Sequence, residues 1–78
     1  MPTMISRGKE LIRINPKDPK RLEESTNVGR TWIPRYNGQG TTGEFYDIMD
    51  AGKELLATTS KGLYYSINEG RTWIFRKH

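Results

Sequence analysis

The chain contains nearly the same eleven-residue segment twice, at residues 25–35 and 66–76. Eight of the eleven positions are identical, and the two copies lie 41 residues apart. A second match precedes each copy, residues 8–12 against residues 52–56, at an offset of 44. A period of this size is typical of repeat architectures, in which each unit is one supersecondary element that stacks on the next. We therefore expect two structurally equivalent units.

Each unit divides into four strand-length segments separated by turn residues. Several segments are rich in β-branched and aromatic residues, which favours strands. The expected strands are 3–6, 9–14, 21–26 and 30–36, then 45–50, 54–59, 63–67 and 71–76. The predicted fold class is all-β, with two four-stranded antiparallel meanders, either packed as a small sandwich or completed by oligomerisation. The single domain would comprise repeat 1 (1–36), a glycine-rich linker (37–44) and repeat 2 (45–78).

The third strands of the two units differ in composition. Residues 63–67 are mostly apolar or aromatic, whereas residues 21–25 carry three charges. A strand that alternates charged and apolar residues faces water on one side. We expect the third strand of repeat 1 to be exposed and its counterpart to be more buried.

A competing pattern begins in the linker. Gly38, Gly40 and Gly43 spell G-x-G-x-x-G, and the apolar residues that follow have near-helical spacing. A glycine loop before a helix binds the pyrophosphate of dinucleotides. The chain is too short for the surrounding parallel sheet, and the repeat partner of this segment reads as two strands. We therefore favour strands over a helix here.

The repeated motif Ser-x-Asn-x-Gly-Arg-Thr-Trp resembles the Asp-box of sialidase-type (BNR-like) repeats, with Asn in place of the Asp. The resemblance implies that each unit is a propeller-blade-like sheet. In that family the boxes lie on the outer rim, away from the catalytic centre, which implies a structural role. The motif residues are Ser25, Asn27, Gly29, Thr31, Trp32, Ser66, Asn68, Gly70, Thr72 and Trp73.

The chemistry of the motif predicts a locked loop. The asparagine side chain accepts N–H groups of its own loop, and the glycine supplies a positive φ. The Ser and Thr hydroxyls are expected to bridge the two strands. The tryptophan closes the base of the hairpin with a large apolar side chain.

Catalytic chemistry finds little support in the sequence. The adjacent carboxylates Glu23 and Glu24 would point to opposite faces of a strand, so they cannot form the facing pair that glycoside hydrolysis requires. The one histidine, His78, is the last residue, and Asp18, Asp47 and Asp50 lack metal-ligand spacing. We predict no catalytic residues, no cofactor and no metal, and hence not an enzyme.

Two functional hypotheses remain. The first is a non-catalytic structural or interaction module whose partner is a second copy or another protein. The alternative is binding of an acidic glycan or nucleic acid by a basic, aromatic surface formed by Arg35, Tyr36, Tyr46, Tyr64 and Arg76. The net charge of +4 also favours weak, non-specific attraction of acidic ligands. The absence of cysteine, signal peptide and apolar span leads us to expect a cytoplasmic protein without a membrane partner.

Overall fold

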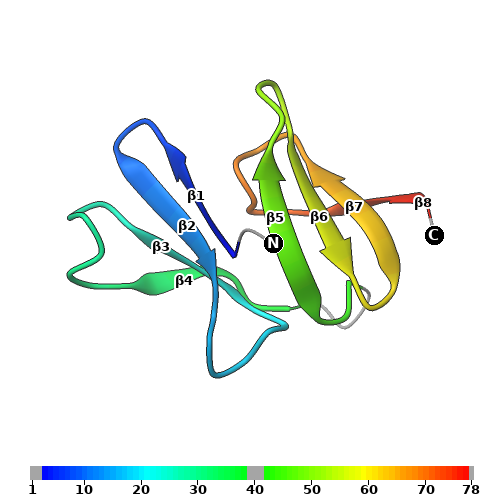
Figure 1. Ribbon diagram of the computed structural model, residues 1–78, viewed down its shortest axis with the longest axis horizontal. Helices are drawn as coiled ribbons and strands as arrows, with labels where there is room; N and C mark the ends of the chain where they lie inside the picture. Colours follow the sequence, from blue (N-terminus) through cyan, green and yellow to red (C-terminus); the bar gives the residue numbers. More distant parts are fainter. Residues whose placement is uncertain (1–2, 39–41, 78) are drawn as a thin grey trace.

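The computed structural model describes residues 3–38 and 42–77, and this part of the chain is all-β (Figure 1). Two antiparallel meanders follow one another along the chain. Sheet 1 contains β1 (Met4–Arg7), β2 (Glu10–Ile14), β3 (Leu22–Ser25) and β4 (Ile33–Tyr36). Sheet 2 contains β5 (Phe45–Asp50), β6 (Leu55–Thr59), β7 (Gly62–Ser66) and β8 (Ile74–Lys77). The predicted fold class is confirmed.

The fourth strand of each sheet begins later than the sequence predicts. We expected starts at residues 30 and 71, but β4 begins at Ile33 and β8 at Ile74. The intervening residues belong to the motif loops described below, whose hydrogen bonds extend to Thr31 and Thr72.

The helical alternative for residues 45–56 is excluded, because this segment forms β5, a turn and the start of β6. Of the three glycines in the G-x-G-x-x-G pattern, Gly40 lies outside the described residues. Within residues 3–38 and 42–77, no helix is long and apolar enough to cross a membrane.

The hydrophobic core lies between the two sheets. Its buried residues come equally from both sheets: Ile12, Ile14, Leu22 and Tyr36 from sheet 1, and Phe45, Ile48, Leu55 and Ala57 from sheet 2. The backbones approach closest where β1 and β2 meet β5. From there the sheets diverge, so that β4 and β8 lie far apart (Figure 1). We call the face of each sheet that contacts this core its inner face, and the opposite face its outer face.

The expectation that the third strand of repeat 1 is exposed was wrong. In β3, Leu22 and Ser25 are buried, and Glu23 and Glu24 are half-buried. The two carboxylates do point to opposite faces, as predicted, and each pairs with an arginine on its own face: Glu23 with Arg13 and Glu24 with Arg35. The charges in this strand therefore reflect ion pairing within the sheet, which the composition of a single strand does not reveal.

Candidate functional site

Each motif loop, residues 25–31 in sheet 1 and 66–72 in sheet 2, is closed by its own side chains. In the second loop the Asn68 side-chain oxygen accepts the Thr72 N–H at 3.0 Å and the Ser66 hydroxyl at 2.9 Å. The Asn68 amide nitrogen donates to the Thr72 hydroxyl at 2.8 Å, and the Gly70 N–H donates to Ser66 Oγ at 2.8 Å. The predicted asparagine-centred turn is therefore present.

The first loop repeats this arrangement almost bond for bond. The corresponding four distances are 3.0, 2.8, 2.8 and 2.8 Å, among Ser25, Asn27, Gly29 and Thr31. The serine and threonine hydroxyls were expected to bridge the strands; in both loops they are joined through the asparagine side chain.

Positive φ values occur at two neighbouring positions in each loop. Gly29 and Gly70 have φ of 86° and 88°, as predicted. The preceding residues, Val28 and Glu69, also adopt the left-handed region, with φ of 64° and 65°. Non-glycine residues rarely adopt this conformation, and nothing in their residue types indicated it. The two loops thus present different side chains, valine and glutamate, from the same backbone position.

The two motif tryptophans have different surroundings. Trp73 packs against the core, with its ring centroid 5.4 Å from that of Phe45, and its indole N–H donates to the Gly70 carbonyl at 3.0 Å. Trp32 lies on the outer face of sheet 1, where the guanidinium of Arg13 stacks 4.0 Å from the ring centroid. Trp73 therefore closes its hairpin against the protein core, whereas Trp32 is covered by the Arg13 guanidinium.

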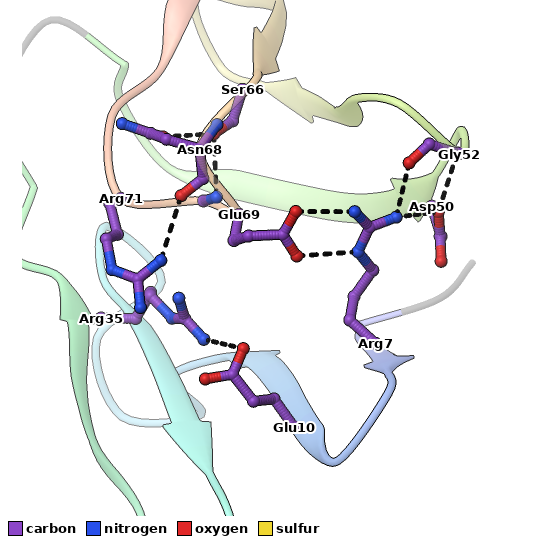
Figure 2. Close-up of polar contacts among 10 residues, drawn as sticks. Arg7, Glu10, Arg35, Asp50, Gly52, Ser66, Asn68, Glu69 and Arg71 are labelled. Atoms are coloured by element: carbon purple, nitrogen blue, oxygen red, sulfur yellow. Dashed lines mark hydrogen bonds and ion pairs between the residues drawn. The ribbon is translucent and has the colours of Figure 1, made fainter.

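Arg7 joins the two sheets at the end of β1 (Figure 2). It forms a bidentate ion pair with Glu69 of the second motif loop, at 2.9 and 2.7 Å. Its Nη1 also donates to Asp50 at 2.6 Å and to the Gly52 carbonyl at 2.7 Å. We call this group the Arg7 cluster. The cluster was not predictable from the sequence, because Arg7 and Glu69 are 62 residues apart and neither residue is shared by the two repeats.

The charges of the Arg7 cluster stabilise one another. Hydrogen bonding from Arg7 lowers the pKa of Glu69 below its ordinary value. The pKa of Asp50 is also lowered, first by the hydrogen bond from the Gly52 N–H and then by Arg7. The carboxylates raise the pKa of Arg7 in turn, chiefly through the hydrogen bond to Glu69. All three groups therefore stay ionised at neutral pH.

A second arginine is buried between the sheets. The Arg35 side chain is 0% exposed, and its nitrogens lie 2.8 Å from Glu10 and 2.9 Å from Glu24. The guanidinium N–H groups are poorly aligned with these oxygens, so the contacts are ion pairs rather than well-formed hydrogen bonds. Figure 2 shows Arg35 and Glu10 next to the second motif loop.

The repeat counterpart of this ion pair is exposed. Arg76 and Glu54 correspond to Arg35 and Glu10, and they form a bidentate pair at 2.9 and 3.0 Å. The hydrogen bond with Glu54 raises the pKa of Arg76. Tyr65 replaces Glu24, and the Arg76 guanidinium stacks 4.2 Å from its ring centroid. The Arg76 side chain is 39% exposed, because it lies on the outer face of sheet 2 rather than between the sheets.

Apolar side chains cross the whole outer face of sheet 2. Four residues lie opposite one another on successive strands: Met49, Leu56, Tyr65 and Ile74. We call them the apolar row. Met49 and Ile74 are 41% and 43% exposed, while Leu56 and Tyr65 are half-buried. The equivalent row of sheet 1 is Ile5, Ile12, Glu24 and Ile33, and its Ile12 is fully buried beneath sheet 2.

The residues considered for glycan or nucleic-acid binding are divided between core and surface. Arg35, Tyr36 and Tyr64 are buried, at 8%, 5% and 6% exposure, whereas Tyr46 is 48% exposed and Arg76 is exposed. The Tyr36 hydroxyl bonds to Thr42, and the Tyr64 ring packs against Phe75. Of the five candidates, only Tyr46 and Arg76 are exposed to solvent.

We also considered surface hollows and groups of metal-binding side chains as candidate functional sites. One hollow lies over residues 58–63 at the β6–β7 turn, and another lies on the outer face of sheet 1. In the described part of the chain, no group of three or more His, Cys, Asp or Glu side chains is placed to hold a metal ion. Comparison of the chain with protein-family models, curated proteins and solved structures gives no match.

Proposed function

We propose that the chain is a non-catalytic interaction module built from two Asp-box-like repeats, each a propeller-blade-like sheet. The observation that carries this proposal is the outer face of sheet 2. It combines the apolar row with the Arg76–Glu54 ion pair, and it is equivalent in sequence to the face of sheet 1 that packs against sheet 2. Exposed apolar surface bordered by polar groups is typical of macromolecular interfaces.

The arginines support an interaction module rather than a sialidase-like centre. Such a centre would hold a substrate carboxylate with several arginines. Here Arg7, Arg13, Arg35 and Arg76 each pair with carboxylates of the protein itself, and these pairs lie in different places on the two sheets. Their charge is used to hold the fold together, which leaves less of it for a substrate.

Hydrolysis assays test the proposal directly. Purified protein is incubated with a fluorogenic sialoside and, separately, with a fluorogenic single-stranded RNA. We expect no turnover above that of a protein-free blank. Turnover above the blank that follows the protein through purification would contradict the non-catalytic assignment.

The alternative, binding of acidic glycans or nucleic acid, rests on two stacked cations. Arg76 stacks on Tyr65 and Arg13 stacks on Trp32, and both pairs lie on outer faces. Arginine and aromatic side chains together hold unpaired bases and acidic groups. The test is fluorescence anisotropy with labelled heparin oligosaccharide and single-stranded RNA at about 50 and 200 mM salt. A specific site predicts that Arg76→Ala or Arg13→Ala weakens binding more than Lys61→Ala does; equal losses would leave only non-specific attraction.

A further inference from the structure

The two sheets do not pack through equivalent faces. The residues that one sheet contributes to the contact correspond, in the other repeat, to residues of the outer face. Sheet 1 contributes Ile5, Ile12 and Leu22, whose repeat counterparts Met49, Leu56 and Leu63 lie on the outer face of sheet 2. Sheet 2 contributes Ile48, Leu55 and Trp73, whose counterparts Met4, Leu11 and Trp32 lie on the outer face of sheet 1. The internal contact is therefore head to tail, and each half of it has an equivalent face on the outside of the described part of the chain.

We infer that a second copy of this chain docks its sheet 1 outer face onto the sheet 2 outer face of the first, repeating the internal contact between chains. The inference rests on the proposed interaction function and names its partner and its surface. Head-to-tail contacts of this kind generate rings when the rotation closes. A closed ring of about four to eight blades would require about two to four copies.

The sheet 2 side of this interface already has the composition of the buried face. Leu56 occupies the position of the fully buried Ile12, and the Arg76–Glu54 pair occupies that of the buried Arg35–Glu10 pair. Tyr65 replaces Glu24, so this face is more apolar than its covered counterpart. Repeating the internal contact would cover Met49 and Leu56, whose counterparts Ile5 and Ile12 are partly and fully buried. Such burial is favourable by about 25 cal/mol for each Å² of apolar surface removed from water.

At one corner of the proposed interface, both residues of the internal Arg7–Glu69 ion pair are replaced. In the internal contact, Arg7 meets Glu69, whereas the equivalent positions in the proposed contact are Ala51 and Val28. Val28 adopts nearly the same φ as Glu69 and is 88% exposed. Replacement of only one partner would leave an unpaired charge at the interface, but both are replaced by small apolar residues.

The hollow on the outer face of sheet 1 lies at this corner. It is lined by Ser6, Gly8, Lys9, Leu11, Thr26 and Val28. Three of these, Ser6, Gly8 and Val28, are the repeat counterparts of Asp50, Gly52 and Glu69, which hold Arg7 in the internal contact. The hollow is thus equivalent to the place on sheet 2 where Arg7 binds at the end of β1. The two carboxylates that bind Arg7 there are absent from the hollow.

The outer face of sheet 1 carries an ion pair, and Lys9 lines the hollow at its corner. Arg13 and Glu23 lie opposite one another there and form an ion pair at 2.9 Å, with side chains 31% and 18% exposed. They would therefore enter the interface as a paired, net-neutral unit, next to Met4, Leu11 and Trp32.

Cysteine cross-linking tests the geometry, because the sequence contains no cysteine. The single variants Val28→Cys and Ala51→Cys change exposed residues at the two halves of the corner. A short bismaleimide should cross-link an equal mixture of the two variants several-fold more than either variant alone. As a matched control, Val28→Cys mixed with Lys61→Cys, an exposed residue at the other end of sheet 2, should give no such gain.

Light scattering after size exclusion supplies an independent readout. The wild type should have a mass of at least two chains of 9.0 kDa, and Leu56→Glu in the apolar row, at the position equivalent to the fully buried Ile12, should reduce it to that of one chain. Ile67→Glu, which changes a residue that is 68% exposed and outside the row, should leave the mass unchanged. Circular dichroism of each variant verifies that it is folded.

Three outcomes would overturn the inference: a wild type that stays monomeric at high concentration, cross-linking of a single variant with itself in preference to the mixture, or a Leu56→Glu mass equal to that of the wild type. The second outcome would indicate a symmetric face-to-face dimer. A monomer without hydrolytic activity would remove the self-association inference but leave the interaction module in place, whereas hydrolysis would remove the module itself.

Discussion

At the scale of single residues, each motif loop is closed by the hydrogen bonds of a neutral asparagine side chain. The Asn68 oxygen accepts two hydrogen bonds and the Asn68 nitrogen donates one, so the side chain links the serine and threonine that flank the loop. A carboxylate would keep both acceptor bonds and lose only the donor, and the Thr72 hydroxyl can turn to donate instead. The loop therefore depends on the acceptor oxygen more than on the charge or the amide nitrogen.

This dependence predicts different effects for two substitutions. Asn68→Ala should reduce the free energy of unfolding by about 1–2 kcal/mol, because the Thr72 N–H and the Ser66 hydroxyl lose their acceptor. Asn68→Asp should change it by less than about 0.5 kcal/mol, since the acceptor remains. Urea unfolding followed by tryptophan fluorescence measures both. Equal losses would show that the amide nitrogen, not the oxygen, holds the loop.

At the scale of the elements, equivalent hairpins have different energetic roles. Trp73 packs on Phe45 and the core, whereas Trp32 lies on an outer face under Arg13. The two sheets are also held together at one end by the Arg7–Glu69 pair, which connects β1 to a loop 62 residues later. Packing and ion pairing between elements thus distinguish two units whose local structures are nearly the same.

The tryptophans should therefore differ in their contribution to stability. We expect Trp73→Ala to reduce the free energy of unfolding by about 3 kcal/mol, because it opens a cavity beside the core. Trp32→Ala should reduce it by about 1 kcal/mol, since only part of its surface is covered by Arg13. Urea unfolding at low protein concentration gives both values. If Trp73→Ala fails to fold, Trp73→Phe against Trp32→Phe preserves the comparison, and equal losses would contradict it.

A double-mutant cycle measures the inter-sheet ion pair. Arg7→Gln, Glu69→Gln and the double variant should yield a coupling energy of about 1 kcal/mol, at the upper end for partly exposed pairs because the geometry is bidentate. The control is Arg21 with Asp18, a single contact at 3.1 Å with side chains 53% and 41% exposed. Its coupling energy should be near zero. Similar coupling energies for the two pairs would mean that the Arg7–Glu69 pair stabilises the protein no more than an exposed surface pair does.

The same cluster predicts a dependence of stability on pH. The pKa values of Glu69 and Asp50 are lowered in the folded protein. Their contribution is therefore present above the ordinary carboxylate pKa, about pH 4.5 and higher, and is lost as the pH falls through the lowered values. Unfolding measured from about pH 6 to 2 should show a smaller loss for Arg7→Gln than for the wild type. Superimposable pH profiles would contradict the role of Arg7.

At the scale of the whole molecule, each sheet has an outer face on which no other described segment of the chain packs. The internal contact buries one face of each sheet, and the repeat places equivalent residues on the remaining faces. A core contributed by two small sheets is thin, since a domain of this size buries only about 60–65% of its unfolded surface. Association through the outer faces would extend the core from sheet to sheet.

Association links stability to concentration. The melting temperature of the wild type should rise as protein concentration increases about 100-fold, because mass action favours the assembled state. The melting temperature of Leu56→Glu should not change with concentration. Calorimetry over the concentration series measures both proteins, and a constant melting temperature for the wild type would count against self-association.

The sequence by itself determined the features that depend on near neighbours. The duplication, the strand spacing and the motif loops all follow from it, because the loop bonds join residues no more than four positions apart. The positive φ of Val28 and Glu69 was not predictable, since valine and glutamate carry no signal for it.

Only the tertiary structure decided which equivalent side chains are covered. Arg35 and Arg76 have the same place in the repeat and the same kind of carboxylate partner, yet one side chain is 0% exposed and the other 39%. The half-buried glutamates of β3 and the pairing of Arg7 with Glu69 were missed for the same reason. Burial and long-range pairing depend on which face of one sheet packs on the other, and a local pattern that occurs twice cannot specify two different neighbours.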